Sequence, residues 1–315
     1  CGNKKTAGEQ QAPAGGPWPG AAEAAAAAGD AGPAVAKTML LLGTPVVRLV
    51  DPGAEPRREQ RSHVSAGDRR VATIVGDQSL DLGLGSGPIQ APTMNVDLQL
   101  TTREAGADGV LLCDYALGNP RLTRAPGATA EPDPAMAELV AKIAGYRGTL
   151  RLDARGVPVA ADLETPAKIP FVLRSVLEQL AWSAIQLAVP FPTEPIGAGA
   201  RWEVDIVYPH SSLTVAQTAT FHLTDLQENG GTVEWTIRQS VAPQPITEPG
   251  ATPVAVSLTK FDGQGSGSWT FDLARLVPVS QDVSLHLVVG VATNVGGAAA
   301  QNESPSDLHI RVTSP

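Results

Sequence analysis

The stretch Ile169–Trp202 limits the fold most, because it holds the longest helix-periodic run in a chain that otherwise alternates between strand and turn patterns. At 100° per residue, most of its apolar side chains fall on one stripe of the helix. Phe171, Trp182 and Ile185 fall on the opposite side. We therefore expect a helix over 169–187 that is either covered on both sides or turns Trp182 toward a cavity, a partner or lipid.

Period-two alternation of apolar and polar residues on both sides of this helix predicts antiparallel strands with one buried face. The clearest case is Thr93–Thr101, where every second residue from Met94 to Leu100 is apolar. Gly263, Gly265 and Gly267 precede an expected strand and suggest a bulge or tight bend. The expected strands are Thr38–Leu42, Val46–Val50, Arg69–Val75, Thr93–Thr101, Gly109–Leu117, Gly148–Asp153, Val157–Leu163, Trp202–Val207, Thr218–Leu226, Thr232–Val241, Val254–Leu258, Ser266–Asp272, Val283–Val291 and Asp307–Val312.

A shorter helix is signalled just before the middle of the chain. Asp133 suits the N-cap, Pro134 suits the first turn, and Gly145 stands where a C-terminal stop belongs. The run Gly148–Leu163, interrupted by the turn residues 154–156, has the pattern of a β-hairpin.

The expected fold is therefore mainly β, with a large curved antiparallel sheet or half-barrel and a central amphipathic helix packed on it. Residues 1–36 are rich in Ala, Gly and Pro and predict a disordered tether. The β-rich domain would span 37–315, with two pseudo-repeated lobes, 37–165 and 188–315, as one arrangement of it. A short internal sequence similarity supports the two lobes, since GTLRLD at 148–153 resembles GSWTFD at 267–272. Chance is a rival explanation of this similarity.

The charge balance narrows the classes of partner. The formal net charge is −9 and the pI is about 5.1, which argues against a nucleic-acid partner, because such partners need a basic surface. The five histidines show no metal-site spacing, and no nucleophile elbow occurs. We therefore expect no catalytic residue, no metal, no cofactor and no enzyme activity, and we expect Cys113, in an apolar run, to be a small buried side chain.

The first residue of the chain is Cys1, followed by Gly2, Asn3 and a polar low-complexity stretch. This start resembles a mature bacterial lipoprotein, in which a signal peptide is removed just before a cysteine that carries the lipid. The alternative is a chain that merely happens to begin at a cysteine. The lipoprotein interpretation predicts a protein of the bacterial cell envelope, anchored in the outer membrane and facing the periplasm or the cell surface.

A labelling experiment tests this anchor. Radiolabelled palmitate should enter the full-length precursor in cells, and the label should be lost in the Cys1→Ser variant, because the thiol is the acyl acceptor. Equal labelling of both proteins would contradict the prediction.

Three segments together resemble an uncharacterised family of bacterial lipoproteins that carry the domain of unknown function numbered 6263. They are FPTEPIGAGARWEV from Phe191, TATFHLTDLQENGGTVEWTI from Thr218, and GSGSWTFDLARLVPVS from Gly265. The family's layout, a long antiparallel sheet with a helix on it, is similar to that of lipoprotein-carrier and LppX-type half-barrels. The resemblance implies a fold that can hold acyl chains, and it supplies no catalytic residues.

These features favour a membrane-anchored lipoprotein that binds an apolar ligand, such as a lipid, between sheet and helix. The expected lining is Leu177, Leu180, Trp182 and Trp202, since ligand cavities are mostly apolar. The alternative is an envelope scaffold or protein-interaction module with a solid core.

Overall fold

The structure, a computed structural model, describes residues 35–41, 43–81, 87–166, 171–210, 213–246, 255–295 and 298–315, all within the compact unit Pro33–Pro315. Nearly all of the predicted tether, including Cys1, lies outside the described residues. The strands are β1 (Val35–Met39), β2 (Val46–Asp51), β3 (Arg69–Leu80), β4 (Ile89–Gln90), β5 (Thr93–Ala105), β6 (Leu111–Thr123), β7 (Arg147–Leu152), β8 (Pro158–Pro166), β9 (Arg201–His210), β10 (Leu213–Gln227), β11 (Gly230–Ser240), β12 (Gln244–Ile246), β13 (Ala255–Asp272), β14 (Ser280–Val295) and β15 (Ala298–Thr313). The helices are α2 (Pro134–Ala141) and α3 (Phe171–Ile185).

The strands form one antiparallel sheet that does not close, which confirms the predicted fold class. Its order is β1-β8-β7-β6-β5-β3-β15-β14-β13-β11-β10-β9-β2, with β4 on β3 and β12 on β13. From β3 to β8, and again from β9 to β15, each long strand pairs with the next one in sequence. The two expected lobes are therefore two parts of one sheet, joined where β3 pairs with β15.

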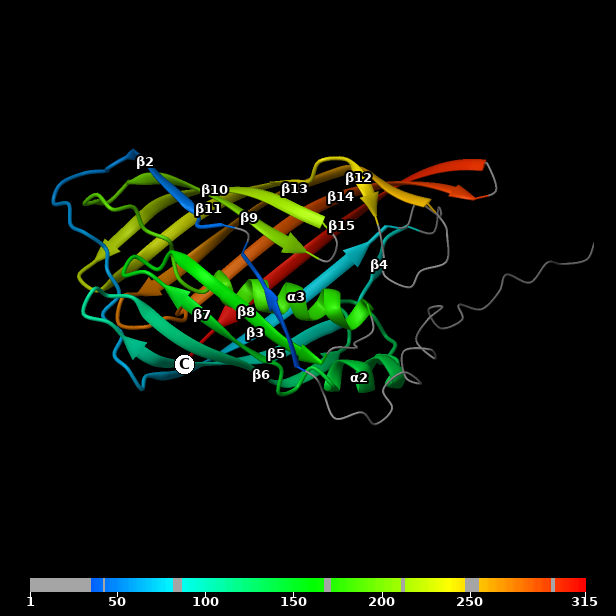
Figure 1. The fold of residues 1–315 in the computed structure, drawn as a ribbon, viewed down its shortest axis with the longest axis horizontal. Coiled ribbons are helices and arrows are strands. Elements are labelled where there is room, and N and C mark those ends of the chain that lie inside the picture. The colour runs from blue at the N-terminus through cyan, green and yellow to red at the C-terminus, as the bar shows by residue number, and fades with distance from the viewer. Residues whose placement is uncertain are drawn as a thin grey trace, which may run out of the picture. The chain divides into compact units, whose positions relative to one another are not determined.

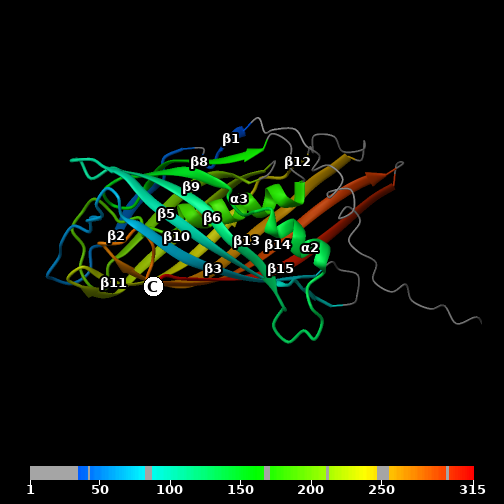
Figure 2. The ribbon, with the colours of Figure 1, turned by 90° about the horizontal axis from the view of Figure 1, so that it is seen from below.

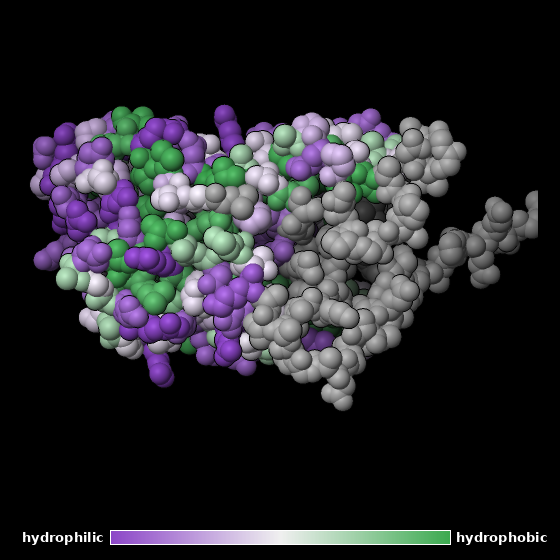
Figure 3. Space-filling model, in the orientation of Figure 1, coloured by the Kyte–Doolittle hydropathy of each residue, from purple (hydrophilic) through white to green (hydrophobic). Residues whose placement is uncertain are grey.

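Side chains alternate between the two faces of the sheet as the sequence pattern predicts. In β5, Val96, Leu98 and Leu100 are buried on the inner face, while Asp97 and Gln99 point outward. The inner faces and α3 together supply most of the core. On the side of the molecule seen in Figure 3, apolar and hydrophilic residues are intermixed over the described surface.

Helix α3 is the connection between β8 and β9, which lie next to the edge strands β1 and β2 at the two ends of the open sheet. Figures 1 and 2 show the sheet curving around this helix, with β7, β8 and β9 on one side of it and β13, β14 and β15 on the other. The helix ends before Pro190 and Pro192, which cannot continue it. Its position between strands explains why both of its sides are apolar.

Strands β1 and β2 extend the two open edges of the sheet, β1 on β8 and β2 on β9. Only residues 40–45 separate them, so Met39 and Val46 can be at most about 25 Å apart. Leu40 and Leu41 in this link are buried in the same apolar cluster as α3. The link therefore runs from one edge of the opening to the other and packs against the helix core.

The predicted short helix and hairpin are confirmed. The Asp133 carboxylate accepts a hydrogen bond from the amide of Ala135, which caps α2, and Gly145 has φ +86°. Strands β7 and β8 pair as expected around the turn at 154–156.

The prediction for the glycines of β13 was wrong. Gly263, Gly265 and Gly267 lie inside one continuous strand, and the register shift falls earlier, between Leu258 and Lys260. All three glycines occupy the inner face, and a Cβ on Gly267 would come within 2.8 Å of Nε1 of Trp235. Their small size makes room for large side chains of neighbouring strands, and no bend is needed.

The two echoing hexapeptides occupy equivalent places in the sheet. Leaving out the short strands β4 and β12, β7 is the fourth strand from β3, and β13 is the fourth from β9. In each hexapeptide the leading glycine faces inward and lies opposite an aromatic residue of the preceding long strand, Tyr115 for Gly148 and Trp235 for Gly267. The two hexapeptides therefore have matching neighbours in the two halves of the sheet, and an internal duplication stays a prediction.

The turns that follow the two hexapeptides are held by one segment of the chain. The amide of Ser62 donates to the carbonyl of Ala154 at 2.8 Å, and the amide of His63 donates to the carbonyl of Leu273 at 2.8 Å. Ala154 and Leu273 each come directly after the final Asp of their hexapeptide. The connection between β2 and β3 therefore forms backbone hydrogen bonds with both halves of the sheet at one end.

Candidate functional site

The predicted apolar site is built around the middle of α3. Leu177 is fully buried, Leu180 is 2% exposed and Trp182 is 6% exposed, all within one cluster. The ring of Trp182 stacks on Tyr208 of β9, with 3.7 Å between ring centroids and 14° between planes. Ile185, which the sequence places on the same side as Trp182, is 1% exposed. The prediction of a helix covered on both sides is confirmed for these residues; the side chain of Phe171 lies outside the described part.

Trp202, the fourth predicted lining residue, lies in a different apolar cluster. Its ring stacks on Phe221 at 5.3 Å, and its Nε1 donates to the carbonyl of Pro190 at 2.8 Å. The structure therefore brings Leu177, Leu180 and Trp182 together and assigns Trp202 to the core beyond the end of α3. Sequence distance from the helix could not show this, because β9 begins beyond the end of α3 and its later residues, such as Tyr208, are the ones that pack against the helix.

A buried polar network lies against Trp182. Nε2 of Gln239 donates to the hydroxyl of Tyr208 at 3.0 Å and to Oε1 of Gln217 at 2.9 Å. Gln217 and Gln239 are 5% and 8% exposed, and burial raises the pKa of Tyr208. Strand alternation places both glutamine side chains on the inner face. Nothing in the sequence indicates that they form a hydrogen-bonded network there. The network fixes the orientation of the ring on which Trp182 stacks.

A second polar contact zone joins α3 to the end of β9. Glu178 is 8% exposed on the helix, and His210 lies on the inner face of β9. Burial lowers the pKa of His210, and the charge of Glu178 opposes this effect. The imidazole is therefore held neutral near pH 7 by its partly apolar surroundings.

This shift predicts a pH dependence of stability. A lowered pKa in the folded state means that the unfolded chain binds more protons below pH 6.5, so the free energy of unfolding should decrease as the pH falls below about 6.5. Urea unfolding at a series of pH values should show a weaker dependence in His210→Gln than in the wild type. The matched control His222→Gln removes an imidazole from the outer face of β10; equal slopes in the two variants would contradict the prediction.

The spaces beside α3 are small. One cavity of about 40 Å³ lies between the end of the helix and strands β9 to β11, and it is lined by Ile185, Ile206 and Phe221 among others. A second, of about 30 Å³, lies near Leu187 and Leu276. Each can hold one or two waters, whereas a lipid-sized ligand needs several hundred Å³. In this conformation α3 itself occupies the space between the two sides of the sheet.

Part of the inner face is covered less completely than the core around α3. Phe261 of β13, Leu285, Leu287 and Val289 of β14, and Leu308 of β15 are all half-buried. They lie side by side because β13, β14 and β15 are neighbours. These residues form a continuous apolar stripe on the concave side of the sheet.

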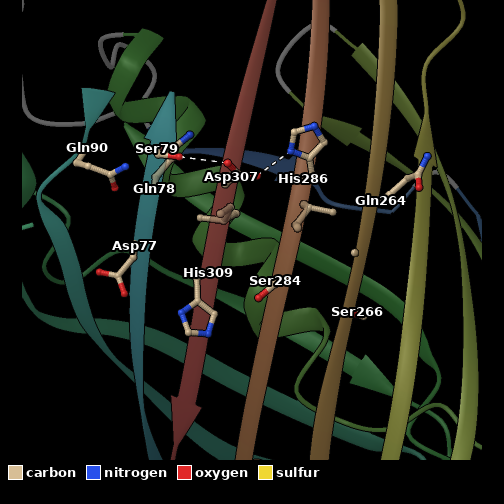
Figure 4. A pocket seen from close by; sticks show the side chains of 13 residues that line it. Asp77, Gln78, Ser79, Gln90, Gln264, Ser266, Ser284, His286, Asp307 and His309 are labelled. Atoms are coloured by element: carbon tan, nitrogen blue, oxygen red, sulfur yellow. Dashed lines mark hydrogen bonds and ion pairs between the residues drawn. The ribbon is translucent and has the colours of Figure 1, made fainter. Parts of the chain in front are cut away.

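A space of about 600 Å³ lies on the outer face of the sheet. Figure 4 shows that its side chains come from β3, β15, β14 and β13, with Gln90 from β4, and that α3 lies behind these strands. Most of the residues that line it are polar, and Ser284, His286, Asp307 and His309 lie near its centre. The sequence pattern did not predict this groove, although the outward polar positions of these strands were the available signal.

The described residues give no sign of a metal site, a membrane-spanning helix or a reactive thiol. No group of three or more His, Cys, Asp or Glu side chains there could hold a metal ion. Neither described helix is long and apolar enough to span a membrane. Cys113 is buried, as predicted, and burial raises the pKa of its thiol to about 11, so it is a poor nucleophile.

The predicted lipidation of Cys1 stays a prediction, because Cys1 lies outside the described residues. Comparison with known proteins finds no protein-family model and no curated protein that matches the chain.

Proposed function

We propose that this protein is a membrane-anchored, extracytoplasmic lipoprotein that binds an apolar ligand, such as a lipid, on the concave face of its sheet. The observation that carries the proposal is the place of α3, which fills the opening of an unclosed sheet whose inner face is apolar. The structure would correspond to the ligand-free state, with the helix in the space that a ligand would take.

The proposal requires that α3 can leave its place at a moderate cost. Its apolar contacts contribute roughly 25 cal/mol per Å² of buried surface. An acyl chain that covers the same inner-face side chains buries the same apolar surface. The free-energy change for replacing the helix with the ligand can therefore be close to zero. The half-buried stripe from Phe261 to Leu308 gives such a ligand a first contact surface without displacing the helix.

The contact that resists this displacement is the stack of Trp182 on Tyr208. Weakening it should make the inner face more available, while weakening the second cluster should not. The pair Trp182→Ala and Trp202→Ala therefore separates loosening of α3 from a general loss of stability.

Two measurements test the proposal. Native mass spectrometry of gently purified protein should show a co-purifying lipid, and the fluorescent probe N-phenyl-1-naphthylamine should bind the wild type. Trp182→Ala should bind more probe than the wild type, and Trp202→Ala should not. If no lipid co-purifies and none of the three proteins binds the probe, the carrier proposal fails.

A scaffold or protein-interaction module is the second candidate, and the filled interior favours it. The cavities beside α3 hold only about 30 and 40 Å³, and Leu177 and Leu180 are almost fully buried. In this case α3 is a permanent part of the core. Amide hydrogen exchange distinguishes the two, since a permanent core helix exchanges only with global unfolding, whereas a displaceable helix exchanges at lower free energy.

A further inference from the structure

The outer groove is separate from the inner apolar site, because the sheet itself lies between them (Figure 4). Its volume of about 600 Å³ lies in the range of ligand sites. It crosses four neighbouring strands, β3, β15, β14 and β13, which spans about 14 Å at the usual strand spacing. Ser284 of β14 is a small residue near its centre, and Gly265 and Ser266, also small, lie on β13 at one side of it.

The acidic groups in and beside the groove already have partners. Asp307 lies 2.7 Å from Nδ1 of His286 and accepts from the hydroxyl of Ser79 at 3.4 Å. Asp77 accepts from Arg311 at 2.8 Å, as does Asp282 from His309 at 3.0 Å if Nε2 carries the proton. The contacts with Asp307 and Asp282 fix the positions of both imidazole rings.

Several neutral groups in the groove have no partner within the described part of the chain. Ser266 and Ser284 are paired across β13 and β14, and neither makes a side-chain hydrogen bond to a described residue. The amide of Gln90 is likewise uncommitted, and each imidazole has one nitrogen left, Nε2 of His286 and Nδ1 of His309. Hydroxyl, amide and imidazole groups both donate and accept hydrogen bonds.

This chemistry excludes several kinds of ligand. An anion would meet the two carboxylates of the lining, Asp77 and Asp307, with one guanidinium, that of Arg311, beside them, and an apolar ligand would leave the Ser, Gln and His groups without partners. The two imidazoles point in opposite directions along their strands in Figure 4, so they do not converge on a metal ion. An uncharged ligand with many hydroxyls satisfies all of these groups.

We propose that the outer groove formed by β3, β15, β14 and β13 is a binding site for a neutral oligosaccharide of a few sugar rings. Sugar hydroxyls would pair with Ser266, Ser284, Gln90 and the free imidazole nitrogens. The site does not depend on the proposed apolar-ligand function, since it uses the opposite face of the sheet.

Binding of chitotetraose, cellotetraose and maltotetraose, each at up to about 10 mM, tests the proposal by isothermal titration calorimetry with the full chain. At least one should bind the wild type, and Ser284→Leu should weaken that binding about tenfold or more, because the leucine fills the middle of the groove. The matched control Thr214→Leu makes the same kind of change at an exposed outer position of β10, which β11 separates from the groove strand β13, and should bind like the wild type.

Thermal unfolding of both variants checks that they fold, and Gln264→Ala, at the edge of the groove, gives a milder second variant that should weaken binding less. The proposal is overturned if none of the three oligosaccharides binds the wild type, or if Ser284→Leu and Thr214→Leu bind equally well. Binding of N-phenyl-1-naphthylamine should be the same in Ser284→Leu and in the wild type, so failure of the inner and outer sites can be told apart.

Discussion

Trp182→Ala should lower the free energy of unfolding by about 3–5 kcal/mol, the usual cost of truncating a buried aromatic side chain. Trp182 is 6% exposed, and its stack on Tyr208 joins α3 to β9. The alanine would leave a cavity between helix and sheet and remove a stacking contact worth about 1 kcal/mol. Urea unfolding followed by circular dichroism measures the change.

A suitable control lies one residue before Tyr208 on the same strand. Val207 is 41% exposed on the outer face, so Val207→Ala should change stability by less than about 0.5 kcal/mol. Trp182→Phe should fall between the two, because it keeps an aromatic ring against Tyr208. A loss below about 1 kcal/mol in Trp182→Ala would show that α3 contributes little to the fold, which is the behaviour of a helix that leaves its place readily.

Gly148→Ala and Gly267→Ala should each cost about 1–3 kcal/mol or more, because an added methyl group has no room at either position. At Gly148 the new Cβ would collide with the carbonyl of Asp162 and with the hydroxyl of Tyr115. At Gly267 it would collide with the carbonyl of Asp282 and with the indole nitrogen of Trp235. Backbone atoms on one side and a packed ring on the other leave little freedom to relax.

Gly76 provides the matched control, since it also lies in a strand and a Cβ there would have nothing within 4 Å. Gly76→Ala should leave stability unchanged or raise it by up to about 1 kcal/mol, because alanine restricts the unfolded chain. Similar losses at 148 and 267 are expected if the two hexapeptides play equivalent parts. If Gly267→Ala leaves the free energy of unfolding unchanged, packing does not require glycine at these positions of β13.

Much of the fold could be predicted from the sequence, because strand and helix periodicity are local signals. The alternation in Thr93–Thr101 and the two-sided character of Trp182 and Ile185 both reappear in the structure. The order of the strands could not be predicted, since pairing such as Asp307 with Ser79 joins residues far apart in sequence. The single strand β13 was divided into two because its inward glycines have no side chain to mark the buried face.

The sites were less accessible to sequence reasoning. Leu177, Leu180 and Trp182 could be predicted because all three are apolar residues of one helix, the two leucines on its main stripe and Trp182 on the opposite side. Trp202 belongs to another cluster, because the sequence does not show where β9 extends. The outer groove needs β3, β13, β14 and β15 side by side, so no local pattern could show it. Its polar residues look like any solvent-facing row until the strands are placed next to each other.

The position of β1 and β2 has a consequence for how copies of this protein stay apart. An open strand edge, with its unpaired N–H and C=O groups, is a template on which another chain can add a strand and start aggregation. Here the edges of β8 and β9 are both covered by one short segment, Val35–Asp51. Lys37 and Arg48 on this segment form ion pairs with Glu164 and Asp205, which puts charged side chains at the outermost edges. Removal of that segment would expose the unpaired edges of β8 and β9 on the same molecule. A molecule with two such edges can add a further copy at each edge and so form open-ended fibres.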